Sequence, residues 1–446
     1  ALVRNDELGH RALHHHAGLN LGKGPGGSMQ QRPIRAETWR LRFGASMVGD
    51  GPGTADLALD EACGPGEDGP MKASVQDLLA GPRGRRLCLE ATRMLSLRVA
   101  ELVFWLGYEL DPGRGTSLVV WSPGGGALEA GARPAVSIEQ AAQAMADLDL
   151  SGLTDEVVQA ALVGTVMSAR YWQEPDGEDV LAGHPAVQAA LEPVAEGVLG
   201  SAVARHWGSP RAAAQWVIDW RAFEDPAPVS RDAQGVLAAW AREERRQEVR
   251  AATEHPADPT ANFSGTWWSI PQGAVVSVGQ IPAGLDLVED DIGAEAATVI
   301  PVRGAGRTYE VRGPRDWVRL CRRFPLEVSA SRRHDWYRVT GRSGRWVIPD
   351  WEQVASEWDA VHLTTLGYLG AATRALPVDA DMATVLAGWN PDTTVWLTDT
   401  VRESEEPRQC WQRVSGDDGW ARCLPVRDVG SEGPARGRGA SPPVEG

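Results

Sequence analysis

The sequence predicts an α+β fold, with helices in the first half of the folded chain and a mainly antiparallel sheet in the second half. Between residues 71 and 254 apolar side chains recur with the helical period. After residue 262, short alternating segments separated by Gly, Pro and Asn are typical of strands and hairpins. Pro256 and Pro259 interrupt the helical pattern between the two stretches, so we place a domain boundary there.

The first stretch predicts a bundle of helices. They are expected around 100–106, 137–147, 154–172, 185–206 and 231–252. Thr154 is expected to cap one of them, because a hydroxyl oxygen can accept a free backbone N–H of the first turn. The last helix is the clearest, since Val236, Trp240 and Val249 lie along one side of a segment rich in Glu and Arg.

The second stretch predicts alternating short strands and helices. Strands are expected at 308–311, 326–328 and 360–366, and hairpins at 336–340 with 346–348 and at 383–388 with 393–398. Pro314 is expected to open a helix that carries Trp317 and Leu320. Asp350, with Gln353 three residues later, predicts the start of a short helix. Together these elements predict an α+β domain with a mainly antiparallel sheet.

We therefore expect a helical domain over 71–255 and an α+β domain over 262–412. Residues 1–70 contain Gly-rich stretches and no sustained period, so they are expected to be a disordered or non-native extension, with Met71 as the start of the folded protein. Residues 431–446 are rich in Gly, Pro and Arg and are expected to be a disordered tail.

Composition restricts the class of protein. Hydrophobic residues make up 43% and charged residues 23%, and no apolar stretch approaches the roughly 20 residues that a membrane helix needs. The five cysteines are scattered and contain no Cys-x-x-Cys pair, which argues against a disulfide framework or a zinc ribbon and suits a reducing compartment. We therefore expect a cytoplasmic protein without membrane contact.

The scarcity of lysine excludes two kinds of enzyme. Of the 44 basic residues only Lys23 and Lys72 are lysines, and neither follows the glycine pattern of a phosphate-binding P-loop. A Schiff-base enzyme needs a buried lysine, and none follows residue 72. P-loop nucleotide hydrolysis and pyridoxal-type chemistry are therefore not expected.

Arginine is concentrated in one segment. Residues 303–345 contain twelve arginines and four acids, although the whole chain has a net charge of −16. Guanidinium groups suit phosphate and carboxylate, so the segment is a candidate site for a phosphate-bearing ligand. Residues 101–200 contain fifteen acids and three arginines, so the segment could equally dock on the protein's own helical domain or on a protein partner. Nucleic acid is the least favoured partner, because an acidic chain repels a polyanion.

Individual site residues follow from this segment. Arg332, Arg333, Arg338, Thr364, Trp336 and Trp346 are the candidate ligand-binding residues. His334, His362 and Glu405 are the candidate acid or base groups, although a histidine on a half-buried strand is more often a core residue.

No metal site is predicted. The His14-His15-His16 run in the N-terminal extension and the acidic trio Glu289-Asp290-Asp291 could each contact a cation, but both are expected to be solvated and inert.

Tryptophan is unusually frequent, with 19 residues against five Phe and five Tyr. Indole rings can stack on bases, nicotinamide or sugars. In a chain with so few Phe, we expect tryptophan to serve mainly as the large aromatic residue of the core.

Two resemblances extend these predictions. The segments Ser331 to Arg338, Gly344 to Trp351 and Trp358 to Thr364 resemble an uncharacterised family of hypothetical proteins from GC-rich bacterial genomes, which implies no activity. Arg338, Thr364-Thr365 and Glu403-Ser404-Glu405 occur in the order of the motifs of ADP-ribosyltransferases, but Leu363-Thr364-Thr365-Leu366 replaces the usual Ser-Thr-Ser strand. That resemblance implies an NAD-using enzyme as the alternative function; without it, no cofactor is expected.

Overall fold

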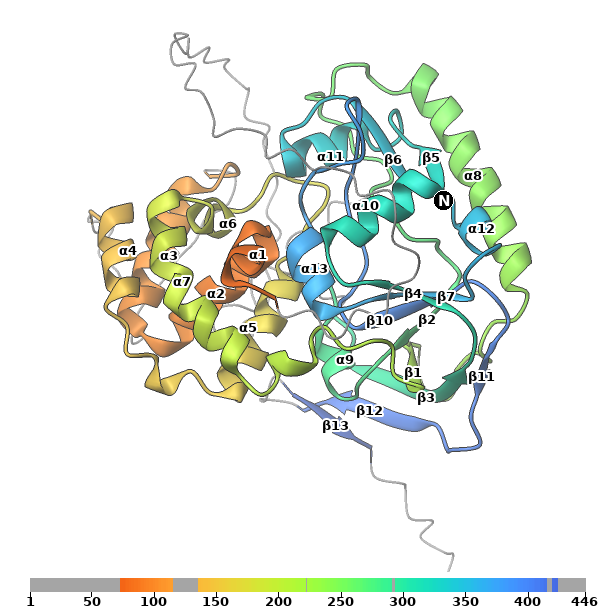
Figure 1. Cartoon of the computed structure of the whole chain (residues 1–446), viewed down its shortest axis with the longest axis horizontal. Helices are drawn as coiled ribbons and strands as arrows, with labels where there is room; N and C mark the ends of the chain where they lie inside the picture. The colour runs from red at the N-terminus through yellow and green to blue at the C-terminus, as the bar shows by residue number, and fades with distance from the viewer. Residues whose placement is uncertain (1–72, 115–134, 222, 291–292, 415–418, 424–446) are drawn as a thin grey trace, which may run out of the picture. The chain divides into compact units, whose positions relative to one another are not determined.

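In the computed structural model the described elements begin with helices, and strands follow from residue 214 onward (Figure 1). The structure describes residues 73–114, 135–221, 223–290, 293–414 and 419–423. The fold is α+β, as the sequence predicts: helices predominate before residue 210 and strands after it. The described residues belong to one compact unit, so the domain boundary near residues 255–262 stays a prediction. The predicted tails 1–70 and 431–446 lie outside the described residues.

The helices before residue 210 pack together as a bundle. They are α1 (Val75–Ala80), α2 (Pro82–Leu95), α3 (Leu97–Leu110), α4 (Ile138–Ala146), α5 (Asp155–Met167), α6 (Gly177–Ala182) and α7 (Pro185–Gly200), with 3-10 turns at Leu150–Gly152 and Ala204–His206. Side chains fix several starts: Ser74 and Ser137 form capping boxes, and the expected Thr154 cap is confirmed. Helix α5 ends at Met167, five residues before the predicted end.

The remaining helices surround two sheets (Figure 1). They are α8 (Ala233–Glu254), α9 (Ala283–Asp286), α10 (Pro314–Arg323), α11 (Arg333–Thr340), α12 (Trp351–Val354) and α13 (Thr365–Ala371). Helix α13 packs against α1 and α2, and one hydrophobic core runs from Leu78 in α1 to Leu397. Burial of this shared core holds the helices against the sheet-containing part.

The larger sheet is antiparallel except for one pair. Its strands are β1 (Ala214–Asp219), β2 (Val275–Val278), β3 (Ala296–Gly304), β4 (Thr308–Val311), β7 (Ala360–Leu363), β10 (Thr393–Trp396), β11 (Val401–Glu403), β12 (Gln409–Arg413) and β13 (Trp420–Arg422). The order is β13-β12-β3-β1-β2-β10-β7-β4, with β11 also paired to β3 and with β4 parallel to β7. Strand β1 lies inside the stretch that the sequence predicts as helical, yet it occupies the middle of this sheet.

The smaller sheet shows where the hairpin predictions are wrong. Its strands are β5 (Pro325–Glu327), β6 (Arg345–Pro349), β8 (Leu376–Pro377) and β9 (Met382–Thr384). The segment 336–340, predicted as a strand, belongs to helix α11, which buries Trp336 and Val339 three residues apart and ends at Gly341 with φ +69°. The predicted hairpin of 383–388 with 393–398 does not form, because β9 and β10 belong to different sheets.

Tryptophan fills the core, as expected. Six indoles are almost fully buried: Trp317, Trp336, Trp346, Trp351, Trp389 and Trp396. The rings of Trp317, Trp351 and Trp389 pack on one another with centroids 5.8 to 6.2 Å apart, a separation typical of edge-to-face and tilted aromatic contacts. The high tryptophan content therefore reflects packing at these positions.

The cysteine expectation needs one correction. Cys410 on β12 and Cys423, just beyond β13, form a disulfide, whereas Cys88 and Cys321 are buried free thiols. This pair could not be predicted from the sequence, since it is formed by strand pairing and not by a recognisable spacing. Among the helices of the described residues, none is both long and apolar enough to cross a membrane.

Candidate functional site

The predicted ligand-binding arginines have partners within the protein. The Arg332 guanidinium is buried and pairs with Glu244 of α8 at 2.8 Å, and it also donates to the Trp268 carbonyl at 3.0 Å. Arg338 is more exposed, but its two terminal nitrogens donate to main-chain carbonyls and to Asp335 at 3.1 Å. Its carbonyl partners are Trp172, Ala261 and Phe263. These contacts fix the segments around α11 to one another.

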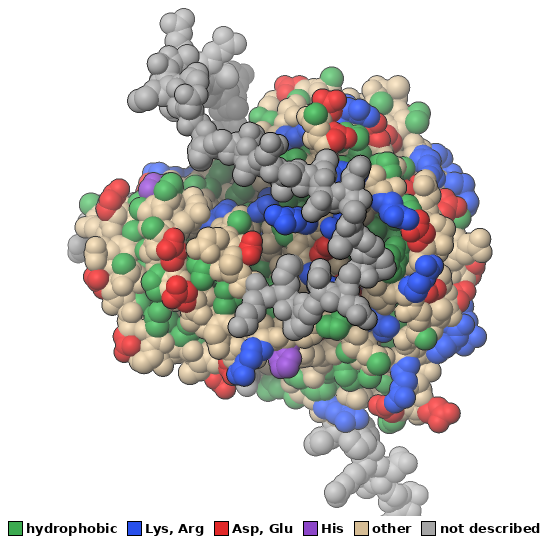
Figure 2. All heavy atoms as spheres, viewed as in Figure 1, with side chains coloured by type: hydrophobic (Ala, Val, Ile, Leu, Met, Phe, Trp, Pro, Cys, Tyr) green, Lys and Arg blue, Asp and Glu red, His purple; other side chains and the backbone are tan. Residues whose placement is uncertain are grey.

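Four further arginines of the arginine-rich segment form ion pairs nearby. Exposed arginines on β3, α10 and β6 pair with acids of the same part of the chain: Arg303 with Glu406, Arg319 with Asp316, Arg323 with Glu357 and Arg345 with Glu327. Arg333 donates to the carbonyl of Pro256. On the face drawn in Figure 2, basic side chains are spread over the sheet-containing part, with acids among them.

The two predicted indoles do not line an open cleft. Trp336 and Trp346 are at most 1% exposed and pack edge to face on each other, with ring centroids 5.3 Å apart. The Trp336 ring nitrogen donates to the carbonyl of Trp267 at 2.9 Å. Both rings therefore serve packing in this structure.

The candidate acid and base groups lie apart from one another. His334 packs on the ring of Phe263, and burial lowers its pKa. His362 on β7 shares a hydrogen bond of 3.0 Å with the Thr394 hydroxyl on β10, and burial lowers its pKa to about 3. Thr364 caps α13 and donates to the carbonyl of Val311, whereas Glu405 is exposed. In the described part of the chain, no hydrogen bond or ion pair joins these groups to Arg338.

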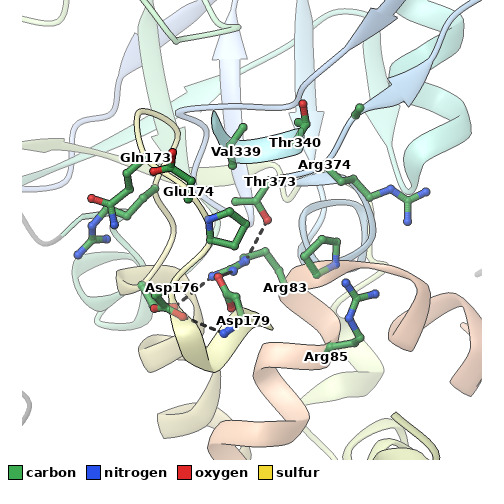
Figure 3. Close-up of a pocket in the computed structure, with 15 residues that line it drawn as sticks. Arg83, Arg85, Gln173, Glu174, Asp176, Asp179, Val339, Thr340, Thr373 and Arg374 are labelled. Carbon is green, nitrogen blue, oxygen red and sulfur yellow. Dashed lines mark hydrogen bonds and ion pairs between the residues drawn. The ribbon is translucent and has the colours of Figure 1, made fainter. Parts of the chain in front are cut away.

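A pocket with a volume of about 250 Å³ lies elsewhere (Figure 3). Its walls come from the start of α2, the segment from Ser168 to Asp179, the last turn of α11, and residues 373–375. Val339 and Thr340 directly follow the predicted Arg338, but none of the predicted site residues lines the pocket. The pocket therefore joins segments that are about 290 residues apart in the chain, such as Arg83 and Thr373.

Arg83 forms the floor of this pocket. It is 1% exposed, and it donates from Nε to the Thr373 hydroxyl at 3.2 Å and from Nη1 to Ser168 Oγ at 3.1 Å and the Thr165 carbonyl at 3.3 Å. Its other terminal nitrogen pairs with Asp179. With hydrogen bonds from all three of its guanidinium nitrogens, Arg83 is a structural group that holds α2, α5, α6 and the 373 turn together.

Thr373 has an unusual backbone. Its φ is +60°, a left-handed conformation that a β-branched residue rarely adopts. Its hydroxyl accepts the Arg83 hydrogen bond, which helps to hold this conformation. Strained residues cluster at binding and catalytic sites, where surrounding contacts maintain them. The turn places the next residue, Arg374, at the rim of the pocket.

Arg85 and Arg374 differ from Arg83 and Arg170, which also line the pocket and each pair with a carboxylate. Both donate from Nη1 to one acceptor, the Ala80 carbonyl, at 3.1 and 2.8 Å, and Arg85 also donates to the Leu79 carbonyl at 2.9 Å. Within the described residues neither forms an ion pair with a carboxylate, and Arg85 Nε has no hydrogen-bond partner. Burial lowers the pKa of both groups; for Arg85, Asp179 opposes this shift, and the charges of Arg374 and Arg83 add to it. Two cations thus meet at this rim, and neither forms an ion pair with a carboxylate of the described residues.

The opposite wall of the pocket carries carboxylates. Asp176 and Asp179 line it and bind Arg86 and Arg83. They belong to a larger group in which three arginines face four acids: Arg83, Arg86 and Arg93 with Glu90, Asp176, Glu178 and Asp179. Glu174, which is exposed, lies on the same wall.

No known protein family matches this chain, and no curated protein or solved structure matches it significantly.

Sequence reasoning missed this pocket for an identifiable reason. Arg85 is one of three arginines in the four residues 83–86, and Arg374 is a single arginine after Thr373. Both lie outside the arginine-rich segment 303–345, and they come together only because α13 packs on α1 and α2. The signal present in the sequence was the group Arg83, Arg85 and Arg86, which lies at the start of α2, where basic residues are unfavourable beside the positive end of the helix dipole.

Proposed function

We propose that this protein binds a small anionic ligand, carrying a phosphate or carboxylate group, in the pocket of Figure 3. Arg85 and Arg374 are the anion-binding groups. The observation that carries the proposal is the convergence of these two guanidiniums on the Ala80 carbonyl without a carboxylate partner in the described residues. The proposed ligand class is the one expected from the arginine-rich segment. The residues that bind it are Arg85 and Arg374, in place of the predicted Arg332, Arg333 and Arg338.

The energetic argument is one of charge compensation. Removing a guanidinium from water costs free energy unless an anion or a set of acceptors replaces the water. The two other arginines that line the pocket, Arg83 and Arg170, each pair with a carboxylate. For Arg85 and Arg374 a bound phosphate or carboxylate would supply that partner, with charge-assisted hydrogen bonds from both guanidiniums.

Single replacements of Arg85 and Arg374 by glutamine test the proposal. Each is expected to weaken binding of inorganic phosphate or of a phosphorylated metabolite by about tenfold to a hundredfold, the effect of losing one charge-assisted hydrogen bond. Isothermal titration calorimetry against a panel of phosphate, acetate, sugar phosphates, nucleotides and NAD measures it. The melting temperature should stay the same or rise, because each change removes an uncompensated cation.

The control is Arg303→Gln, which changes the net charge equally but replaces an exposed arginine on β3. It should leave affinity within twofold of the unaltered protein, roughly the spread expected of a distant surface change. If no anion of the panel binds the unaltered protein, or if Arg303→Gln weakens binding as much as the pocket variants, the pocket proposal is wrong.

The same panel of anions also tests the two other functions that the sequence suggests, the NAD-using enzyme and the docking module. Binding of NAD that depends on Arg338 and Glu405 would favour the ADP-ribosyltransferase-like alternative. A protein whose arginine-rich segment only docks on its own acidic helices or on a protein partner would bind none of these small anions.

A further inference from the structure

We propose that the ligand is a zwitterion, with an ammonium group as well as an anionic group. This inference rests on the proposed function: it takes the anionic group to lie between Arg85 and Arg374. The ammonium group then lies at the opposite end of the pocket, against the wall that carries Glu174 and Asp176. The structure thus assigns a chemical class, a small amino compound with one phosphate or carboxylate.

The separation of charge across the pocket supports this assignment. In Figure 3, Glu174 and Asp176 lie at one end and Arg85 and Arg374 at the other, with Arg83 and Thr373 between them. At the basic end two cations have no carboxylate partner in the described residues. The acidic end is lined by Glu174 and by Asp176, which pairs with Arg86. Arg170 also lines the pocket, but it pairs with Asp290.

The acidic end has a further acceptor that no described residue occupies. Neither Glu174 nor the neighbouring Gln173 forms a side-chain hydrogen bond or ion pair with the described residues, although both line the pocket. Asp176, in contrast, is committed to Arg86 and to capping α6. Glu174 is therefore the carboxylate free to contact a ligand, and a ligand with anions at both ends would face it unfavourably.

Matched pairs of probes test the inference. Phosphoethanolamine is compared with ethyl phosphate, and 4-aminobutyrate with butyrate, so that the members of each pair differ by the ammonium group and the two pairs distinguish phosphate from carboxylate. In the pair that binds, the ammonium compound should bind about fivefold tighter, the gain from an ion pair at a half-open site. Titration calorimetry on the full chain measures both affinities.

Glu174→Gln should reduce that ratio to about one. Because Glu174 is exposed and has no partner among the described residues, this variant should melt as the unaltered protein does. Glu192→Gln, an exposed glutamate on α7 that does not line the pocket, is the charge-matched control and should keep the ratio. A ratio near one in the unaltered protein, or a ratio that survives Glu174→Gln, overturns the zwitterion assignment while leaving anion binding intact. Loss of all binding by both pairs instead overturns the proposed function.

Discussion

Replacing Arg86 by methionine is expected to lower the free energy of unfolding by about 3–5 kcal/mol at pH 7, the cost of leaving buried carboxylates without their cation. Arg86 on α2 is 2% exposed and pairs with four acids: Glu90, Asp176, Glu178 and Asp179. Burial opposes its charge, but the carboxylates raise the pKa of its guanidinium well above the usual value. Methionine keeps much of the side-chain volume and removes the charge, so the loss reports on electrostatics. Urea unfolding followed by circular dichroism measures it.

The matched control is Arg98→Met, on the exposed side of α3. Arg98 is 63% exposed and its ion pair with Glu101 is 3.5 Å long, so its loss should cost less than about 1 kcal/mol. The deficit of Arg86→Met should also shrink between pH 7 and pH 4. Carboxylates left without Arg86 have raised pKa values, and they become neutral as the pH falls. Equal effects of the two variants, or a deficit independent of pH, would contradict this account.

Glu289→Gln is expected to stabilise the protein at pH 8 by about 3 kcal/mol and to leave stability unchanged at pH 4. Burial raises the pKa of Glu289 to about 7, although a hydrogen bond of 2.5 Å from the Tyr171 hydroxyl opposes the shift. The folded protein therefore prefers the neutral carboxyl. Its contribution is fully present below the unfolded pKa of about 4.3 and is lost as the pH rises through 7. Glutamine stays neutral throughout, so the variant avoids that loss.

Thermal or urea unfolding at pH 4, 6 and 8 measures this effect. Some decline with pH should persist in the variant, because burial also raises the pKa of Glu310 to about 7. The exposed Glu192→Gln serves as the control and should show no gain at pH 8. If Glu289→Gln is instead less stable than the unaltered protein at pH 8, the folded protein requires the ionised carboxylate. Tyr171, Tyr368 and Arg83, which act to lower the pKa of Glu289, would then stabilise its charge.

Local patterns in the sequence were sufficient for elements whose stability is mostly local. The helices α4, α7, α8 and α10 begin within three residues of the predicted starts, since caps, prolines and the helical period are encoded within one turn. The role of tryptophan as the main core aromatic could also be predicted, because composition alone shows the scarcity of Phe.

Segments with competing signals could not be assigned in this way. Residues 333–340 contain Trp, Tyr, Val and Thr, which favour strands, yet Gly341 and the pairing of Arg338 with Asp335 one turn earlier support a helix. Strand β1 is only six residues long and lies between helices, so its place in the sheet depends on β2 and β3. Propensity is a weak guide where tertiary contacts decide.

By itself the sequence determined the α+β class and most helix positions. It also led to the predictions that P-loop and Schiff-base chemistry are absent and that arginines bind an anion. Only the tertiary structure decided which arginines have carboxylate partners. Arg332 pairs with Glu244 and Arg338 with Asp335, whereas Arg85 and Arg374 meet across 289 residues of chain on a main-chain carbonyl. Every guanidinium carries a positive charge whatever its position in the chain. Whether a carboxylate lies beside it depends on which segments pack there, and a local sequence pattern does not show this.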